Sequence, residues 1–307
     1  MKQWLYTYKL YYRMFRLKHI LIILLLLLNA VVINAQQDRV SAAYSLLQSG
    51  NLDSARVMID LAVADSESVN DGQAWYLKGF IYKSIYNKRE KSNRISPARI
   101  EALNAFKRSY IIDTSVQNVS ENVKNITYLA TTLYNDAALS LDTVNYKLAI
   151  DNFELFKVFY KLIDTSQANI KRNDIKFLLA LASVYTQIYE KDRKGKSDFL
   201  TFSKVTYNKV LALDPNNVSA YYNMGILFYN QAVQLINQSD YDIDIVALND
   251  IQDNSVKLFK ESLPFMEKAY KLDPKRRETL LGLSGIYFSL NEKEKSDLYK
   301  QKLQEIK

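Results

Sequence analysis

Carboxylates are the main side chains in this sequence that could carry acid–base or metal chemistry, because thiols and imidazoles are almost missing. The 307 residues include no Cys and a single His, His19, which lies in a basic and apolar N-terminal segment. The remaining chain therefore has no thiol nucleophile, no imidazole base and none of the usual zinc ligands. No spacing in the sequence fixes two carboxylates at a common site. We predict that the protein is not an enzyme and that it takes no metal and no cofactor.

One acidic stretch has a spacing that suggests calcium, since Asp240, Asp242 and Asp244 alternate with other residues. An EF-hand loop needs Gly at its sixth position and Glu at its twelfth. Counting from Asp240, those positions hold Ile245 and Ile251. The sequence therefore disfavours a calcium loop at this position.

The net charge of +8 suggests nucleic acid or an acidic membrane as a partner, but the charge is unevenly placed. Five of the 41 basic residues and none of the 33 acidic residues lie before residue 36, which leaves 36 basic against 33 acidic residues beyond it. A remainder of +3 gives little electrostatic reason to bind nucleic acid. We predict no nucleic-acid partner and at most peripheral contact with a membrane.

The N-terminal segment has the order of a secretory signal. Basic residues precede an apolar run from Ile20 to Ile33, interrupted by Asn29, and small Ala35 is followed by Gln36. Fourteen residues are fewer than the roughly 20 that a spanning helix needs. We predict a cleaved signal over residues 1–35, with an uncleaved anchor as the alternative, and we favour Met14 as the true start. Export would place the protein in the periplasm or at the outer envelope.

The elements that must position any site are amphipathic helices in a repeated register. Tyr221, Met224, Gly225 and Phe228 form one helix face, and Leu280, Leu283, Ser284 and Tyr287 repeat its spacing. A second helix per unit carries small, large and small residues at spacings of four and three, as at Ser262, Met266 and Ala269, before Asp273-Pro274. The pattern predicts two helices per unit.

This register resembles the tetratricopeptide repeat, whose period is about 34 residues. The resemblance implies an all-α, right-handed superhelical solenoid that binds other proteins. Six such pairs account for residues 36–307 as one repeat domain, and the first pair is a helix over Val40–Gln48 and a helix capped by Asp53.

The resemblance also implies a concave groove lined by the first helix of each unit. Aromatic residues with polar tips suit an extended peptide or a partner helix, although packing beneath inserted segments is an equal alternative. Family members that grip a C-terminal carboxylate use converging Lys and Asn, and the corresponding positions here are mostly aromatic or small, so that activity is not carried over. The groove candidates are Tyr76, Phe80, Lys83, Tyr222, Ile226, Tyr229, Asn230, Leu281 and Phe288.

Three inserts fall between the two helices of a unit, at residues 88–98, 191–198 and 240–253. In a stacked array such turns share one edge. They are either solvated loops or an edge with a basic and an acidic half that docks a partner or another copy. The basic candidates are Lys88, Arg89, Lys91, Arg94, Lys191, Arg193, Lys194 and Lys196, and the acidic candidates are Asp240, Asp242, Asp244, Asp250 and Asp253.

Together these features predict a non-catalytic scaffold of the cell envelope that binds other envelope proteins, with a second copy of the chain among the partners to consider. The alternative is a periplasmic protein that binds a peptide or a glycan in the same groove.

Overall fold

The computed structural model describes residues 39–65, 70–164, 166, 168–237 and 244–306. The predicted signal over residues 1–35, Met14, Asp240 and Asp242 lie outside these residues. Within them, every regular element is a helix, and no strand occurs. None of these helices combines the length and the hydropathy that crossing a membrane requires.

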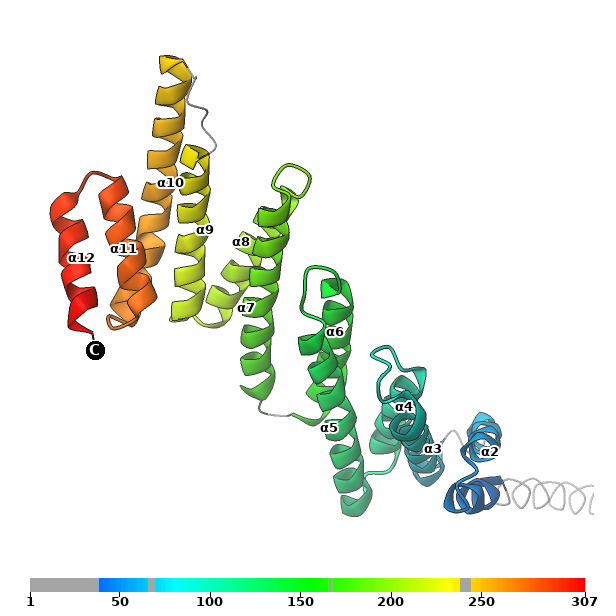
Figure 1. Ribbon diagram of the computed structural model, residues 1–307. Helices are drawn as coiled ribbons and strands as arrows, with labels where there is room; N and C mark the ends of the chain where they lie inside the picture. The colour runs from blue at the N-terminus through cyan, green and yellow to red at the C-terminus, as the bar shows by residue number, and fades with distance from the viewer. Residues whose placement is uncertain (1–38, 66–69, 165, 167, 238–243, 307) are drawn as a thin grey trace, which may run out of the picture. The chain divides into compact units, whose positions relative to one another are not determined.

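The helices follow one another in pairs, as the sequence predicted (Figure 1). The all-α, tetratricopeptide-like solenoid class is therefore confirmed. The six pairs of the described chain are residues 39–48 with α2 (Leu52–Ala64), α3 (Gly72–Ile85) with α4 (Pro97–Ile112), α5 (Val116–Leu139) with α6 (Tyr146–Ile163), α7 (Ala168–Lys191) with α8 (Asp198–Leu213), α9 (Val218–Asn237) with α10 (Ile245–Leu272), and α11 (Arg277–Ser289) with α12 (Lys293–Glu305).

The chain divides into two compact units. Of the described residues, the first unit contains those up to residue 136 and residues 152–163, and the second contains residues 137–151 and those from residue 164 onward. The division passes through α5 and α6, so the turn between them belongs to the second unit. A single repeat domain over residues 36–307 stays a prediction.

In the first unit, small residues let the helices of a pair approach closely. Gly79 of α3 faces the fully buried ring of Phe106 in α4, and a Cβ on this glycine would lie 2.7 Å from the ring carbons. Ala55, Ile59 and Ala62 of α2 are fully buried at the spacing expected for a second helix. The small, large, small pattern is therefore a packing pattern.

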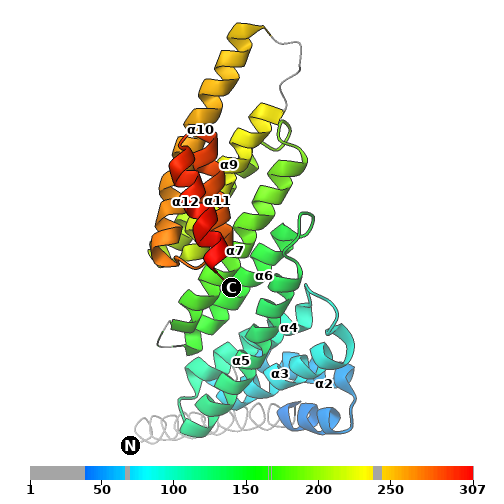
Figure 2. The same cartoon turned by 60° about the vertical axis from the view of Figure 1, so that its left-hand side comes forward.

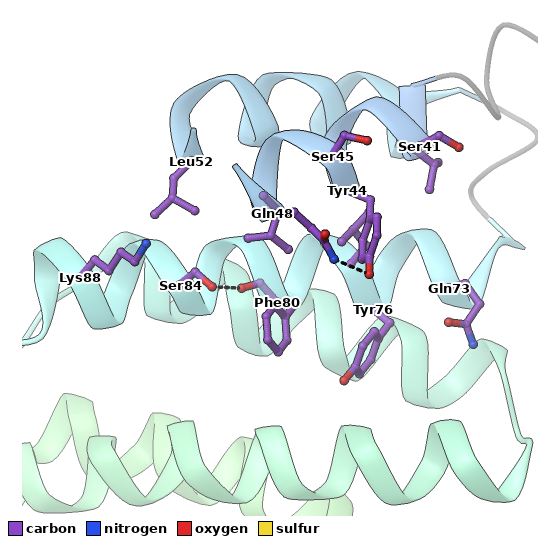
Figure 3. Close-up of a pocket in the computed structure, with 13 residues that line it drawn as sticks. Ser41, Tyr44, Ser45, Gln48, Leu52, Gln73, Tyr76, Phe80, Ser84 and Lys88 are labelled. Carbon is purple, nitrogen blue, oxygen red and sulfur yellow. Dashed lines mark hydrogen bonds between the residues drawn. The ribbon is translucent and has the colours of Figure 1, made fainter. Parts of the chain in front are cut away.

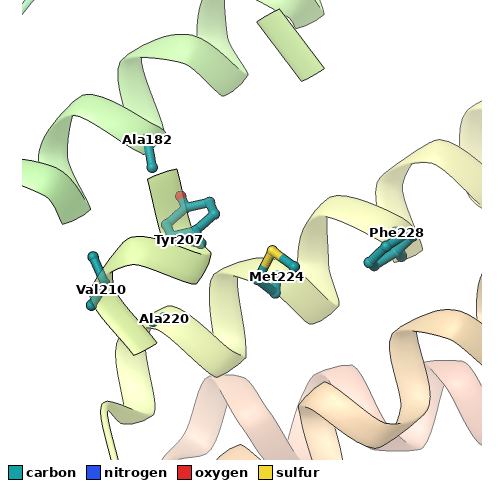
Figure 4. Packing of buried hydrophobic residues seen from close by; sticks show 6 residues of the cluster. All are labelled: Ala182, Tyr207, Val210, Ala220, Met224 and Phe228. Carbon is teal, nitrogen blue, oxygen red and sulfur yellow. The ribbon is translucent and has the colours of Figure 1, made fainter. Parts of the chain in front are cut away.

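The second unit repeats this arrangement. Figure 4 shows a buried cluster that three consecutive helices supply, α7 with Ala182, α8 with Tyr207 and Val210, and α9 with Ala220, Met224 and Phe228. Gly225 lies against Met266 of α10, and the Ser262 hydroxyl donates a 2.7 Å hydrogen bond to the Gly225 carbonyl oxygen. Both small positions of the repeat thus serve the contact between helices.

One helix start differs from the prediction. Asn51, and not Asp53, caps α2, since the Asn51 side chain accepts a hydrogen bond from the Ser54 backbone N–H. Asp53 lies in the first turn and accepts two hydrogen bonds from Arg89, at 2.6 and 3.2 Å. Either carboxamide or carboxylate can cap a helix, so residue type alone did not separate the two positions.

Two of the predicted inserts are partly helical. Beyond Ile85, α3 continues as a π-helix, η2 (Tyr86–Glu90), so Lys88 and Arg89 lie on a helix and the turn is confined to residues 91–96. Asp244 caps α10 by accepting from the Val246 and Ala247 backbone N–H groups. From residue 245 onward the predicted acidic insert is helical and not a loop. Asp250 and Asp253 accordingly lie within α10.

A buried ion pair holds three elements of the first unit together. Arg99 of α4 is fully buried, and its guanidinium lies 2.5 Å from a carboxylate oxygen of Asp136 in α5. The same group donates to the Arg94 carbonyl oxygen at 2.7 Å and stands 5.3 Å from the centre of the Tyr86 ring in η2. The π-helix thus places an aromatic face against a buried cation.

Candidate functional site

A large cavity lies in the first unit, between the segment 39–48 and α3. Its volume is about 940 Å³, within the range of small-molecule and peptide sites. In Figure 3, Tyr44 extends from the segment 39–48 towards α3, and Tyr76 and Phe80 lie along α3. The lining residues are Val40, Ser41, Tyr44, Ser45, Leu47, Gln48, Leu52, Gln73, Tyr76, Leu77, Phe80, Ser84 and Lys88.

The segment 39–48, the start of α2, α3 and the π-helix η2 position this lining. Tyr76 and Phe80 lie one turn apart on α3 with ring centres separated by 6.4 Å. Tyr76 also meets the Phe106 ring edge-on at 5.7 Å, which fixes its orientation from the core side. Gln48 donates a 2.7 Å hydrogen bond to the Tyr44 hydroxyl across one turn of the opposite helix. The rings are therefore held from behind while part of their surface stays open.

The lining combines aromatic surface with hydroxyl and amide groups, and Lys88 is the one charged member among the described residues. Tyr44 is 53% exposed and Phe80 is 38% exposed, although both are large and ring-bearing. Such side chains bury much area at a low cost in conformational entropy when a ligand covers them. The pocket can therefore hold an uncharged or weakly acidic chain segment.

The structure brings Tyr76, Phe80 and Lys83 close together, although Lys83 is not among the residues that line the pocket. The Lys83 ammonium group donates a 2.7 Å hydrogen bond to the Asn125 side-chain oxygen of α5. It also lies 5.4 Å from the centre of the Phe80 ring and 5.3 Å from that of Tyr128. Burial lowers the pKa of Lys83, and nearby Glu121 opposes this effect. Lys83 thus joins α3 to α5 beside the pocket.

Some groove candidates of the second unit pack against the core, and others are exposed. Tyr222 carries the Arg276 guanidinium 4.3 Å from its ring centre, and the Tyr229 ring lies 5.5 Å from Phe259. Both tyrosines are half-buried against the core, whereas Leu281 and Phe288 of α11 are 62% and 68% exposed. The second unit therefore offers less open aromatic surface on α9 than the sequence predicted.

Asn230 and Arg193, which the sequence assigned to a groove and to an edge, lie together. They line a smaller cavity of about 320 Å³ with Glu190, Val233, Gln234 and Asn237. The Asn230 amide donates to a Glu190 carboxylate oxygen at 3.5 Å, and the Arg193 guanidinium stands 5.3 Å from the Tyr189 ring centre. Groove and edge therefore meet in the second unit.

The remaining basic candidates are surface groups with varied partners. Arg89 pairs with Asp53, and Lys191 donates a 3.1 Å hydrogen bond to the Thr143 hydroxyl. Lys91, Lys194 and Lys196 are exposed. Among the described residues, no three His, Cys, Asp or Glu side chains converge in a way that could hold a metal ion.

The sequence analysis predicted the segment around Tyr44 as a helix but gave it no binding role. The repeat register was the signal that could have found it, because the resemblance assigns a groove face to the first helix of every pair, the first pair included. Its pocket residues Ser41, Ser45 and Gln48 are small or polar, so they did not stand out from the sequence.

A family model described as a TPR repeat matches residues 205–231. The matched segment runs from α8 into α9, and it includes Tyr207, Met224 and Phe228 of the buried cluster. The resemblance to tetratricopeptide repeats is thus supported over this part of the chain. Among curated proteins, none matches this sequence.

Several solved structures are similar over most of the chain at low identity. Pseudomonas aeruginosa pilF is 13% identical over 89% of this chain and 91% of its own, with a TM-score of 0.34. The MamA protein is 16% identical over 74% and 91%, with a TM-score of 0.32. YrrB, described as a TPR protein with an unusual peptide-binding site, is 15% identical over 79% and 88%, with a TM-score of 0.26. At these TM-scores, no site or partner transfers to this chain.

Proposed function

We propose that this protein is a non-catalytic scaffold that binds a peptide segment or a helix of a partner protein in the pocket between the segment 39–48 and α3. The observation that supports this is the cavity of about 940 Å³ with part-exposed Tyr44 and Phe80 and a lining of hydroxyl and amide groups. Repeat folds commonly bind partners on such extended surfaces. The partner's apolar side chains would cover the rings, and its backbone would meet Gln48, Gln73 and Ser84.

A random peptide library presented to the full-length protein tests this proposal. Peptides selected on the wild-type chain should bind the Tyr44→Ser/Phe80→Ser variant at least about tenfold more weakly, because both exposed rings are lost. The matched control is Val57→Ser/Leu61→Ser, since these α2 side chains are each 48% exposed and lie outside the pocket lining. Equal binding to the wild type and the pocket variant would contradict the proposal.

The same lining also suits a glycan, because aromatic faces with hydroxyl and amide groups are what sugar rings contact. A glycan array probed with the same pair of variants separates the two ligands. Binding to a glycan that Tyr44→Ser/Phe80→Ser removes, without any selected peptide, would identify the protein as a glycan-binding protein instead.

We also propose that the scaffold works in the cell envelope, among other envelope proteins. The support is the basic segment followed by the apolar run Ile20–Ile33 and the Ala35-Gln36 junction. Mass spectrometry of the protein from its host tests this, with Gln36 expected as the first residue and a retained N-terminus as the contrary result.

A further inference from the structure

The first turns of α10 form a helix end that no other helix among the described residues covers. Figures 1 and 2 both show α10 projecting beyond α9 and α11 at its N-terminal end. The side chains there agree with the picture, since Ile245 is 74% exposed, Val246 66% and Leu248 48%. Isolated exposed apolar residues are ordinary, but three within four positions at a helix end form a patch.

This patch continues the buried seam of the same helix. The core side of α10 contains Ser255, Phe259, Ser262, Met266 and Ala269, all nearly or fully buried, at alternating spacings of four and three. The same spacing, extended towards the N-terminus, reaches Gln252, Leu248 and Ile245. Alternating steps of three and four are those by which one helix packs along another. The exposed end is therefore shaped for a helix, and Gln252 provides a polar position of the kind that specifies register.

The charges beside the patch favour a partner of positive charge. Asp244, Asp250 and Asp253 are exposed, and the sequence contains no Lys or Arg between Lys209 and Lys257. Within the described residues, neither Asp250 nor Asp253 has an ion-pair partner. A second α10 laid along the first would set these carboxylates against one another, which disfavours pairing of two copies through this helix.

We propose that the projecting end of α10 is a second docking surface, which takes an amphipathic helix of another protein whose apolar seam is flanked by Lys or Arg. The partner's apolar residues lie on Ile245 and Leu248, and its cations face Asp250 and Asp253. The uncovered segment 245–254 is about 15 Å long at 1.5 Å per residue, so the contact is short and its affinity modest. This surface does not depend on the pocket of the first unit.

Binding of a synthetic helical peptide to the full-length protein tests the proposal. The probe is about three heptads long, with Leu at the seam positions and Lys at the flanking positions, and the control peptide has Glu in place of Lys. The wild-type chain should bind the Lys peptide at least about tenfold more tightly than the Glu peptide. Ile245→Ser/Leu248→Ser should remove binding, and Asp250→Lys/Asp253→Lys should reverse the preference between the peptides. Tyr44→Ser/Phe80→Ser should leave binding unchanged.

Each other outcome overturns the proposal. Unchanged binding to Ile245→Ser/Leu248→Ser, or no preference between the peptides, would show that the patch does not recognise a basic helix. Failure of both peptides to bind the wild-type chain has the same meaning. Sedimentation that shows a wild-type dimer dissociated by Ile245→Ser/Leu248→Ser would identify a second copy as the occupant. A lower urea midpoint for that variant would show that the chain's own residues cover the patch.

Discussion

At the scale of single residues, the ion pair between the fully buried Arg99 and the part-buried Asp136 has a large energetic consequence. Removing one member leaves the other charge in a site from which its ion partner is gone, and this costs about 3–5 kcal/mol in comparable pairs. We expect Arg99→Ala to lower the free energy of unfolding by this order, as measured by urea titration. Replacing both residues, as Arg99→Met/Asp136→Leu, should recover most of the loss.

An Arg99→Ala variant as stable as the wild type would show that the ion pair adds nothing to the free energy of unfolding. The sequence analysis gave Arg99 no role. A charged residue in the first turn of a helix is ordinarily solvated, and the aromatic face of Tyr86 depends on a π-helix that no local sequence pattern indicated.

At the scale of helices, the crossing of α3 and α4 depends on Gly79. A methyl group there would meet the Phe106 ring at 2.7 Å, and this ring is fully buried and has no space to move. Gly79→Ala should therefore destabilise the first unit by about 1–3 kcal/mol, measured by urea unfolding of the full chain. If the crossing is the cause, Phe106→Leu in the Gly79→Ala background should cost less than the two single changes added together. If the free-energy costs of the two changes are simply additive, the contact between Gly79 and Phe106 is not the cause of the destabilisation.

The helix scale is where the sequence predicted most. Gly225 and Ser262 lie at the small positions that the repeat register predicted, because a repeat constrains residue size at those positions more strongly than residue chemistry. The boundaries of the inserts were harder to predict from the sequence. The acidic stretch around Asp250 and Asp253 has the composition of a loop, and yet it is part of a helix. These residues are helical because Asp244 caps α10 and because the buried side of α10 begins at Ser255. Counting the charges of the stretch reveals neither feature.

At the scale of the whole chain, the buried tyrosines link stability to alkaline pH. Burial raises the pKa of Tyr207 to about 12, and it also raises the pKa of Tyr82 and of Tyr287. A raised pKa means that the folded chain holds the phenolic proton more tightly than the unfolded chain, whose tyrosines titrate near 10.0. This part of the stability is fully present below pH 10 and is lost as the pH rises through the folded pKa.

We therefore expect urea midpoints to fall steadily as the pH rises above about 10, followed with tyrosinate absorbance. Tyr207→Phe should make this decline less steep, because its ring has no proton to lose. A midpoint that stays constant through the tyrosine titration would contradict this expectation. The repeat register predicted the helix face that contains Tyr287, whereas the exposed end of α10 could not be predicted, since it depends on how far α9 extends beside it.

The π-helix η2 makes the surroundings of the pocket sensitive to chain length as well as to side-chain chemistry. Successive residues of a regular helix leave the axis about 100° apart, so loss of a single codon within residues 86–90 would turn every later side chain of that stretch by about that angle. Lys88 would leave the cavity and Arg89 would leave Asp53, although the composition of the segment would hardly change. An in-frame deletion in this stretch would thus change which ligand the pocket accepts. A comparison of residue types alone would not reveal that change.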